Sequence, residues 1–239
     1  MSNIAIVFAG GTGKRMNTRS KPKQFLEIHG KPILVYTLEV FNGHPEIDGI
    51  VLVMLKEWIG FCEELIARYG LSKVRAVVAG GDSALHSQYK GLKEAAALFG
   101  TDSIVLIHDG VRPLVDEATI SRNIASVREH GSAVTVTPAI ETIIVKSDTQ
   151  EIAQIIERSK VELARAPQSF YLKDILEAHK RAEEEGKDFI DSASMMLHYG
   201  HSLYSVEGSP ENIKITTPND FYTLKALLDA REDSQVFGI

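Results

Sequence analysis

The sequence is poor in cysteine and in long apolar runs. Its one cysteine, Cys62, cannot form an internal disulfide or a multi-cysteine zinc or iron–sulfur site. The surrounding pattern indicates that Cys62 is a small, buried, hydrophobic side chain on a helix that also carries Trp58 and Leu65. No apolar stretch approaches the length of about eighteen residues that a membrane span needs, so we expect no membrane partner.

The sequence also lacks a cluster of basic residues. Its formal net charge is −6, and its lysines and arginines are scattered, which argues against nucleic-acid binding as the main task. The N-terminal segment MSNIAIVFAGG has neither a basic leader nor an apolar stretch long enough for a signal peptide. We therefore expect a cytoplasmic protein with no nucleic-acid partner.

Short β-branched runs alternate with helical patterns up to Pro138. This alternation predicts an α/β fold with a mostly parallel sheet, covered by helices on both faces, in which ligands bind at the carboxyl ends of the strands. The predicted strands are Ile4–Phe8, Gly49–Met54, Val74–Val78, Ser103–Ile107 and Ala133–Val136. The predicted helices between them are Ile33–Asn42, Glu57–Tyr69, Leu85–Leu98 and Glu117–Glu129.

A hairpin pattern interrupts this alternation. Two β-like runs, Thr142–Val145 and Ile152–Ile156, are joined by the polar stretch Lys146–Glu151. We interpret residues 139–160 as an arm projecting from a single domain of residues 1–239. The isoleucines of the arm need cover, and a partner subunit is the simplest source, so we expect a homodimer. The remaining predicted elements are helices Leu172–Glu184 and Asp191–Tyr199, strand Ser202–Val206, and a last helix that begins at Thr217 and Pro218.

The richest segment for chemistry follows the first predicted strand and runs from Phe8 to Met16. Its glycines let backbone N–H groups approach an anion without interference from a Cβ atom, and Arg15 adds a guanidinium suited to phosphate oxygens. The spacing matches neither the dinucleotide fingerprint nor a P-loop. A tight turn is the structural alternative for the glycines, and a solvated pair of lysines is the alternative for Lys21 and Lys23.

Five motifs follow one another along the chain. They are Ala9-Gly10-Gly11-Thr12-Gly13-Lys14-Arg15-Met16 with Pro22-Lys23-Gln24-Phe25-Leu26; Gly80-Gly81-Asp82 with Ser87; His108-Asp109-Gly110-Val111-Arg112-Pro113; Ala166-Pro167-Gln168-Ser169-Phe170; and Glu207-Gly208 with Asn212-Ile213-Lys214-Ile215-Thr216-Thr217-Pro218. Together they resemble the cytidylyltransferases that act on 2-C-methyl-D-erythritol 4-phosphate or D-ribitol 5-phosphate. The resemblance spans nearly the whole chain and implies a single Rossmann-like nucleotidyltransferase domain.

The resemblance also implies a reaction, in which CMP passes from CTP to a small polyol phosphate and pyrophosphate is released. Because both reactants are anionic, cations that hold the phosphates would lower charge repulsion and orient the attack, and a bridging Mg²⁺ would add to this effect. The implied catalytic cations are Arg15, Lys23 and Lys214. The implied nucleotide-binding residues are Ala9, Gly10, Gly11, Thr12, Gly13, Gly81, Asp82, Ser87 and Asp109. The implied acceptor-binding residues are Asp109, Arg112, Thr142, Arg158 and Lys214.

Two of these residues have chemistry that the sequence leaves open. Asp109 closes a strand at the carboxyl edge of the sheet, where a carboxylate can meet a metal ion or a substrate hydroxyl; a turn or helix cap is the alternative. Arg112 can bind substrate or pair with a surface carboxylate. His108 points away from Asp109 if the strand alternates, so we expect it to pack in the core.

Our prediction of the acceptor considers three positions at which this sequence differs from the family pattern. Ala166 and Ile190 stand where the erythritol-phosphate enzymes have threonines, and Ala84 stands where the family has an arginine. Loss of hydroxyl donors near a polyol changes selectivity strongly, so we favour D-ribitol 5-phosphate, with 2-C-methyl-D-erythritol 4-phosphate as the alternative. An inactive nucleotide-sensing or scaffold subunit and a dinucleotide oxidoreductase are the other hypotheses.

Overall fold

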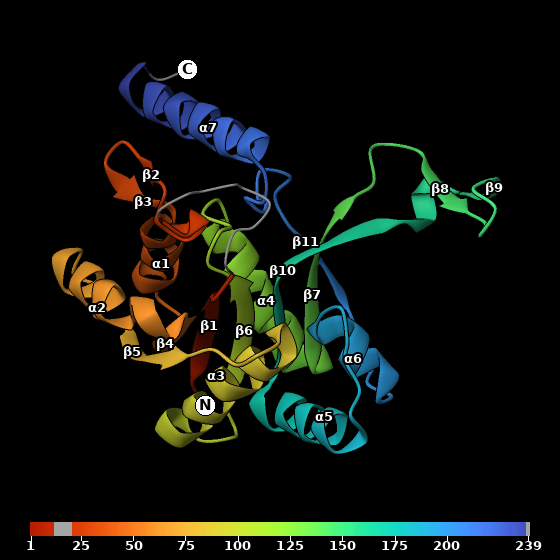
Figure 1. Cartoon of the computed structure of the whole chain (residues 1–239), viewed down its shortest axis with the longest axis horizontal. Helices are drawn as coiled ribbons and strands as arrows, with labels where there is room; N and C mark the ends of the chain where they lie inside the picture. Colours follow the sequence, from red (N-terminus) through yellow and green to blue (C-terminus); the bar gives the residue numbers. More distant parts are fainter. Residues whose placement is uncertain (12–20, 238–239) are drawn as a thin grey trace.

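The computed structural model describes residues 1–11 and 21–237 and has a seven-stranded sheet at its centre (Figure 1). The strand order is β11-β7-β10-β6-β1-β4-β5. Every neighbouring pair is parallel except those of β10, which runs antiparallel to both β6 and β7. The strands are β1 (Asn3–Ala9), β4 (Gly49–Met54), β5 (Val74–Ala79), β6 (Ile104–Asp109), β7 (Ser132–Pro138), β10 (Glu162–Tyr171) and β11 (Ser205–Glu207). The prediction of a mostly parallel α/β fold is confirmed.

Helices cover both faces of the sheet because successive strand residues point to opposite faces. Ala5 and Val7 pack with α1, α2 and α4, whereas Ile4 and Ile6 pack with α3, α5 and α6. The first group comprises α1 (Ile33–Gly43), α2 (Ile59–Arg68) and α4 (Glu117–His130). The second comprises α3 (Ala84–Phe99), α5 (Leu172–Glu185) and α6 (Ser192–His198). The last helix, α7 (Pro218–Phe237), packs through Leu224 on a third, smaller cluster.

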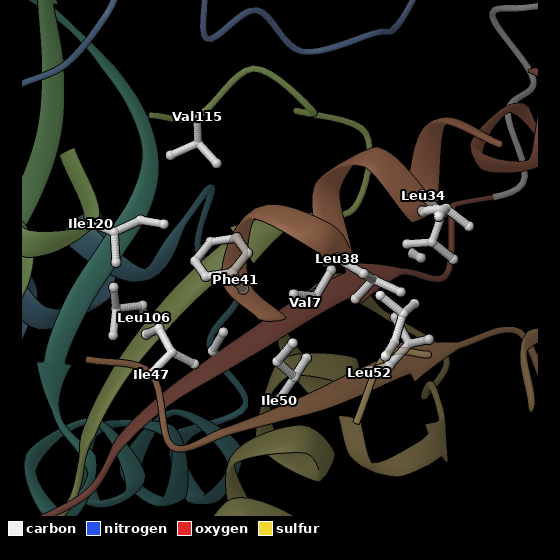
Figure 2. Close-up of a cluster of buried hydrophobic side chains, with 14 of the residues drawn as sticks. Val7, Leu34, Leu38, Phe41, Ile47, Ile50, Leu52, Leu106, Val115 and Ile120 are labelled. Carbon is white, nitrogen blue, oxygen red and sulfur yellow. The ribbon is translucent and has the colours of Figure 1, made fainter. Parts of the chain in front are cut away.

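One cluster of buried hydrophobic side chains lies on the α1 face of the sheet. Figure 2 shows Leu38 and Phe41 of α1 lying over Val7 of β1 and Ile50 of β4. Cys62 is buried in the same cluster, which confirms its predicted structural role. Burial in this apolar environment raises the pKa of the Cys62 thiol to about 12, so the thiol stays protonated.

Three strands were not predicted from the sequence. The short strands β2 (Glu27–Ile28) and β3 (Lys31–Pro32) form a small hairpin around Gly30. The long strand β10 contains Pro167, which follows a cis peptide bond, and its pairing with β7 shifts register between Ala164 and Gln168. Proline and a bulge both disrupt the alternation by which a strand is recognised in a sequence.

The predicted arm is present. Strands β8 (Ile143–Lys146) and β9 (Ile152–Ile156) pair with each other and project away from the main sheet (Figure 1). The side chains of Ile144, Ile152 and Ile155 are exposed, the latter two by 63%. Within the part of the chain that the structure describes, no helix is long and apolar enough to cross a membrane.

Candidate active site

A cleft of about 570 Å³ lies at the carboxyl edge of the parallel strands. It is lined by the ends of β1 and β6, by the loop between β5 and α3, by the beginning of β10, and by the segment before α7. Because β10 is antiparallel to its neighbours, its first half rather than its last reaches this edge. The predicted site residues that line the cleft are Ala9, Gly10, Gly11, Lys23, Gly81, Asp82, Ser87, Asp109, Arg112 and Lys214.

Five predicted site residues do not belong to this set. Thr12, Gly13 and Arg15 lie outside the described residues. Thr142 and Arg158 belong to the arm, are exposed, and do not line the cleft of their own chain. Arg158 instead donates a hydrogen bond from its guanidinium to the carbonyl oxygen of Ile140, at 3.0 Å.

Asp109 forms ion pairs with two cations that line the cleft, Lys214 and Arg112. Its Oδ1 lies 2.7 Å from Nζ of Lys214, and its Oδ2 accepts a hydrogen bond from Nε of Arg112 at 2.8 Å. Burial by itself raises the pKa of Asp109, but the charges and hydrogen bonds of Lys214 and Arg112 outweigh this effect and lower the pKa to about 2. Asp109 is therefore ionised at neutral pH, and the carboxylate partner of Arg112 lies inside the cleft rather than on the outer surface.

The segment that carries Lys214 is fixed at several points. Asn212 donates from its side chain to the carbonyl oxygen of Ala166, and its own carbonyl oxygen accepts from Arg112 at 2.9 Å. The amide of Ile215 donates to Val111, and Nζ of Lys23 donates to the carbonyl oxygen of Ile215 at 2.8 Å. Lys23 and Lys214, distant in sequence, are thereby brought to the same side of the cleft.

The loop after β5 is held by Ser87. Its Oγ accepts a hydrogen bond from the amide of Gly81 at 2.9 Å and donates to the carbonyl oxygen of Ser83 at 2.8 Å. A Cβ atom on Gly81 would lie 2.8 Å from the ring of His86, too close for any larger residue without a shift of that ring. Among the described residues, no atom lies within 4 Å of the position that a Cβ would take on Gly10 or Gly11.

His108 packs in the core, as predicted. Its ring lies 5.0 Å from that of Phe41, and its Nε2 is 3.1 Å from the carbonyl oxygen of Arg112. Burial lowers the pKa of His108 to about 4, so the ring is neutral and holds the turn after β6 rather than taking part in proton transfer.

Several cleft residues were missed by the sequence analysis as site residues. Gln168 donates to Asp191 and accepts from the amide of Ala193, so it ties β10 to the start of α6. Arg165 lines the cleft three residues before Gln168, and its position directly before the Ala-Pro-Gln motif was the available signal. The missed residues with polar side chains are Gln24, Ser83, Gln88, Arg165, Gln168, Asp191 and Ser192.

The arrangement matches a known family. The family model described as 2-C-methyl-D-erythritol 4-phosphate cytidylyltransferase matches residues 3–230. The chain belongs to this cytidylyltransferase family. The enzyme is 50% identical over 240 residues to a ribitol-5-phosphate cytidylyltransferase of Streptococcus agalactiae serotype V, with all of both chains covered. It is 40% identical to a 2-C-methyl-D-erythritol 4-phosphate cytidylyltransferase of Clostridium acetobutylicum, with 95% of this chain and 97% of the relative covered.

A solved structure supports the same assignment of fold. The crystal structure of 4-diphosphocytidyl-2C-methyl-D-erythritol synthase from Anaerococcus prevotii superposes on the enzyme with a TM-score of 0.83 and 27% identity. The match covers 95% of this chain and 96% of that one. The predicted nucleotidyltransferase fold and enzyme class are thus confirmed, and the hypotheses of a scaffold subunit and of an oxidoreductase are not supported.

Proposed function

We propose that the enzyme transfers CMP from CTP to D-ribitol 5-phosphate, giving CDP-ribitol and pyrophosphate. The identity along the full chain to a relative named for ribitol 5-phosphate supports this acceptor, since it exceeds the identity to the relative named for methylerythritol phosphate. The cleft is consistent with this choice. Ala166 and Ile190 line it, and neither side chain carries a hydroxyl group for the acceptor.

The main structural support for this reaction is the cluster of Asp109 with Lys214 and Arg112 in the cleft. In the reaction, an oxygen of the acceptor phosphate forms a bond to the α-phosphorus of CTP. The bond between that phosphorus and the oxygen bridging to the β-phosphate breaks, and pyrophosphate leaves with the electron pair. The attacking phosphate is already ionised, so no general base is needed, and cations in the cleft would stabilise the charge that builds up in the transition state.

The residues of the cleft are compatible with Mg²⁺. This ion is usually held through one or two carboxylates together with substrate phosphates and water. Asp109 is ionised, faces the cleft and has lone pairs beyond those used by its two cations, so it would be the protein ligand. Among the described residues no group of three His, Cys, Asp or Glu side chains forms a site that holds a metal without the nucleotide. When bound, Mg²⁺ would neutralise phosphate charge.

We further propose that residues 1–239 form a single domain that works as a homodimer through the 139–160 arm. The exposed isoleucines Ile144, Ile152 and Ile155 support this arrangement, because apolar side chains on a projecting hairpin are stabilised by a second surface. Thr142 and Arg158 lie away from the cleft of their own chain. If they bind the acceptor, they do so in the cleft of the neighbouring subunit.

The acceptor is tested by measuring pyrophosphate release with CTP, Mg²⁺ and each polyol phosphate in turn. We expect kcat/KM for D-ribitol 5-phosphate to exceed that for 2-C-methyl-D-erythritol 4-phosphate by about 100-fold or more, in the range that sites reading hydroxyl groups achieve. A preference for the methylerythritol compound would overturn the choice of acceptor. Pyrophosphate release with neither compound would overturn the proposed function as a whole.

A further inference from the structure

The strand order divides the cleft into two halves. Asp109 ends β6, which lies between β1 on one side and β10 on the other. Gly10 and Gly11 after β1, and residues 81–83 after β5, belong to the β1 side, where the family resemblance places the nucleotide. The β10 side contributes Ala164, Arg165 and Ala166 to the cleft. An acceptor that attacks the α-phosphorus from the face opposite the leaving group would occupy this second half.

Arg165 is held in position on the β10 side. Its Nε donates a hydrogen bond to Oγ1 of Thr137 at 3.3 Å, and Thr137 is buried on the neighbouring strand β7. The residue falls within the register shift between Ala164 and Gln168, where β10 bends out of regular pairing. Within the described residues, its two terminal guanidinium nitrogens have no hydrogen-bond partner, although the side chain lines the cleft.

The charge around Arg165 is unbalanced. Asp109 already pairs with Lys214 and Arg112, and no carboxylate of the described residues lies within 4.0 Å of Arg165. Asp191, the other carboxylate on the β10 side of the cleft, accepts a hydrogen bond from Gln168. Burial, together with the positive charge of nearby Arg112, lowers the pKa of Arg165. Two guanidinium groups kept near each other in a partly buried cleft repel, and an anion placed beside them would relieve the repulsion.

We infer that Arg165 binds the phosphate group of the acceptor and selects a phosphorylated polyol over the free polyol. This inference rests on the proposed function and adds a binding residue to it. The guanidinium is planar and presents parallel N–H groups, which suit two oxygens of one phosphate. Since Nε is occupied by Thr137, the terminal nitrogens are the groups that face the ligand. In this position the charge also holds the attacking phosphate beside the pair of Asp109 and Lys214.

The test compares Arg165→Gln and Arg165→Lys with Arg75→Gln, a matched control on the exposed edge strand β5 that does not line the cleft. Steady-state rates are measured while CTP and D-ribitol 5-phosphate are varied separately, and direct binding of D-ribitol 5-phosphate and of D-ribitol is measured by calorimetry. We expect Arg165→Gln to raise KM and Kd for the phosphorylated acceptor by about 10- to 100-fold, as loss of a charged hydrogen bond does. KM for CTP should stay within about twofold, because uniform loss of acceptor binding leaves nucleotide binding intact.

Two further variants separate a ligand contact from a general structural effect. Arg165→Lys keeps the positive charge but loses the planar, parallel N–H groups of the guanidinium. Its KM for the acceptor should therefore lie between those of the wild type and Arg165→Gln. Thr137→Val removes the acceptor of the Nε hydrogen bond with little change of shape, and we expect a smaller rise in the same KM. Binding of free D-ribitol should be unaffected by all of these changes. The melting temperature of each variant shows whether it is folded.

Two results would contradict the binding role of Arg165, and a third would contradict the proposed function on which it rests. An unchanged KM and Kd for D-ribitol 5-phosphate in folded Arg165→Gln would overturn the inference. A rise confined to KM for CTP, or to KM for pyrophosphate in the reverse reaction, would assign Arg165 to the nucleotide instead and would also overturn it. If the wild-type enzyme converts neither polyol phosphate, the proposed function fails and the inference fails with it; that result appears in the wild type and is distinct from an effect of the variants.

Discussion

Nζ of Lys214 lies 2.7 Å from Oδ1 of Asp109, which connects the segment before α7 to the end of β6. Asn212 in the same segment accepts a hydrogen bond from Arg112 and donates one to Ala166 of β10, so the segment is fixed at several points beside the cleft. The pair also leaves Asp109 ionised, since Lys214 and Arg112 together lower the pKa of Asp109 to about 2 despite its burial. The charge of one carboxylate therefore positions two cations that the reaction can use.

Replacing Asp109 by asparagine tests this relationship. Asp109→Asn keeps the shape of the side chain but leaves Lys214 and Arg112 without their anion, and it removes the proposed ligand of Mg²⁺. We expect kcat to fall by about 100-fold or more, a loss typical of misplaced groups that stabilise transition-state charge. Pyrophosphate release measures the rate, and circular dichroism shows whether the fold is retained. A folded Asp109→Asn enzyme with wild-type kcat would contradict the proposed role.

Nucleotide choice gives a second prediction, which does not depend on the acceptor. CTP with Mg²⁺ should raise the melting temperature more than ATP or GTP at the same concentration, because only a ligand that binds the native state stabilises it. Differential scanning fluorimetry without any polyol phosphate makes the comparison. Equal shifts with ATP and CTP would argue against a cytosine-specific site.

Two buried histidines predict sensitivity to acid. Burial lowers the pKa values of His108 and His179 to about 4, below the usual value of 6.5. The native state therefore favours the neutral rings, and this contribution to stability is present above pH 6.5 and is lost as the pH falls towards 4. Each histidine should lower the free energy of unfolding by about 2 kcal/mol between pH 7 and pH 5.

Urea unfolding of His179→Gln measures this effect outside the active site. His179 stacks on Tyr89 between α5 and α3 and does not line the catalytic cleft. The variant should lose about 2 kcal/mol less stability than the wild type between pH 7 and pH 5. A pH dependence identical to that of the wild type would show that folding does not lower the pKa of His179.

The sequence predicted most of the parallel sheet because its strands are buried on both faces and are rich in β-branched residues. The family resemblance placed Gly81, Asp109 and Lys23 in one site, and all three line the cleft. The sequence did not predict β10, where Pro167 and a bulge remove the alternation. Arg165 was missed because its strand was missed. Its place in the cleft depends on the insertion of β10 as an antiparallel strand between β6 and β7.

The arm leads to a prediction about assembly. Ile144→Asp should weaken dimerisation, because burial of an isoleucine contributes roughly 1.5–3 kcal/mol and a buried charge opposes it. Sedimentation should show more monomer, and pyrophosphate release should fall with it if the site is shared. A wild-type enzyme that is fully active as a monomer would contradict the proposal.

Subunit mixing tests whether each arm serves the neighbouring cleft. Lys23→Ala and Arg158→Ala chains should each be nearly inactive alone. Lys23→Ala damages the cleft of its own chain, whereas Arg158→Ala damages the cleft of the partner subunit. After exchange, about half of the dimers contain one of each chain and have one complete site, so about a quarter of wild-type activity should return. No recovery after confirmed exchange would show that Arg158 does not act across the interface.

The central claim is that the CMP unit of CTP is the group transferred, and isotopic labelling tests it most directly. The enzyme is incubated with Mg²⁺, D-ribitol 5-phosphate and CTP that carries ³²P at either the α- or the γ-phosphate, and the products are separated by anion exchange. The account predicts that α-label appears in CDP-ribitol and γ-label in pyrophosphate, in equal molar amounts. Transfer of the γ-label to the polyol phosphate, or release of the α-label as free CMP with no labelled polyol product, would contradict it.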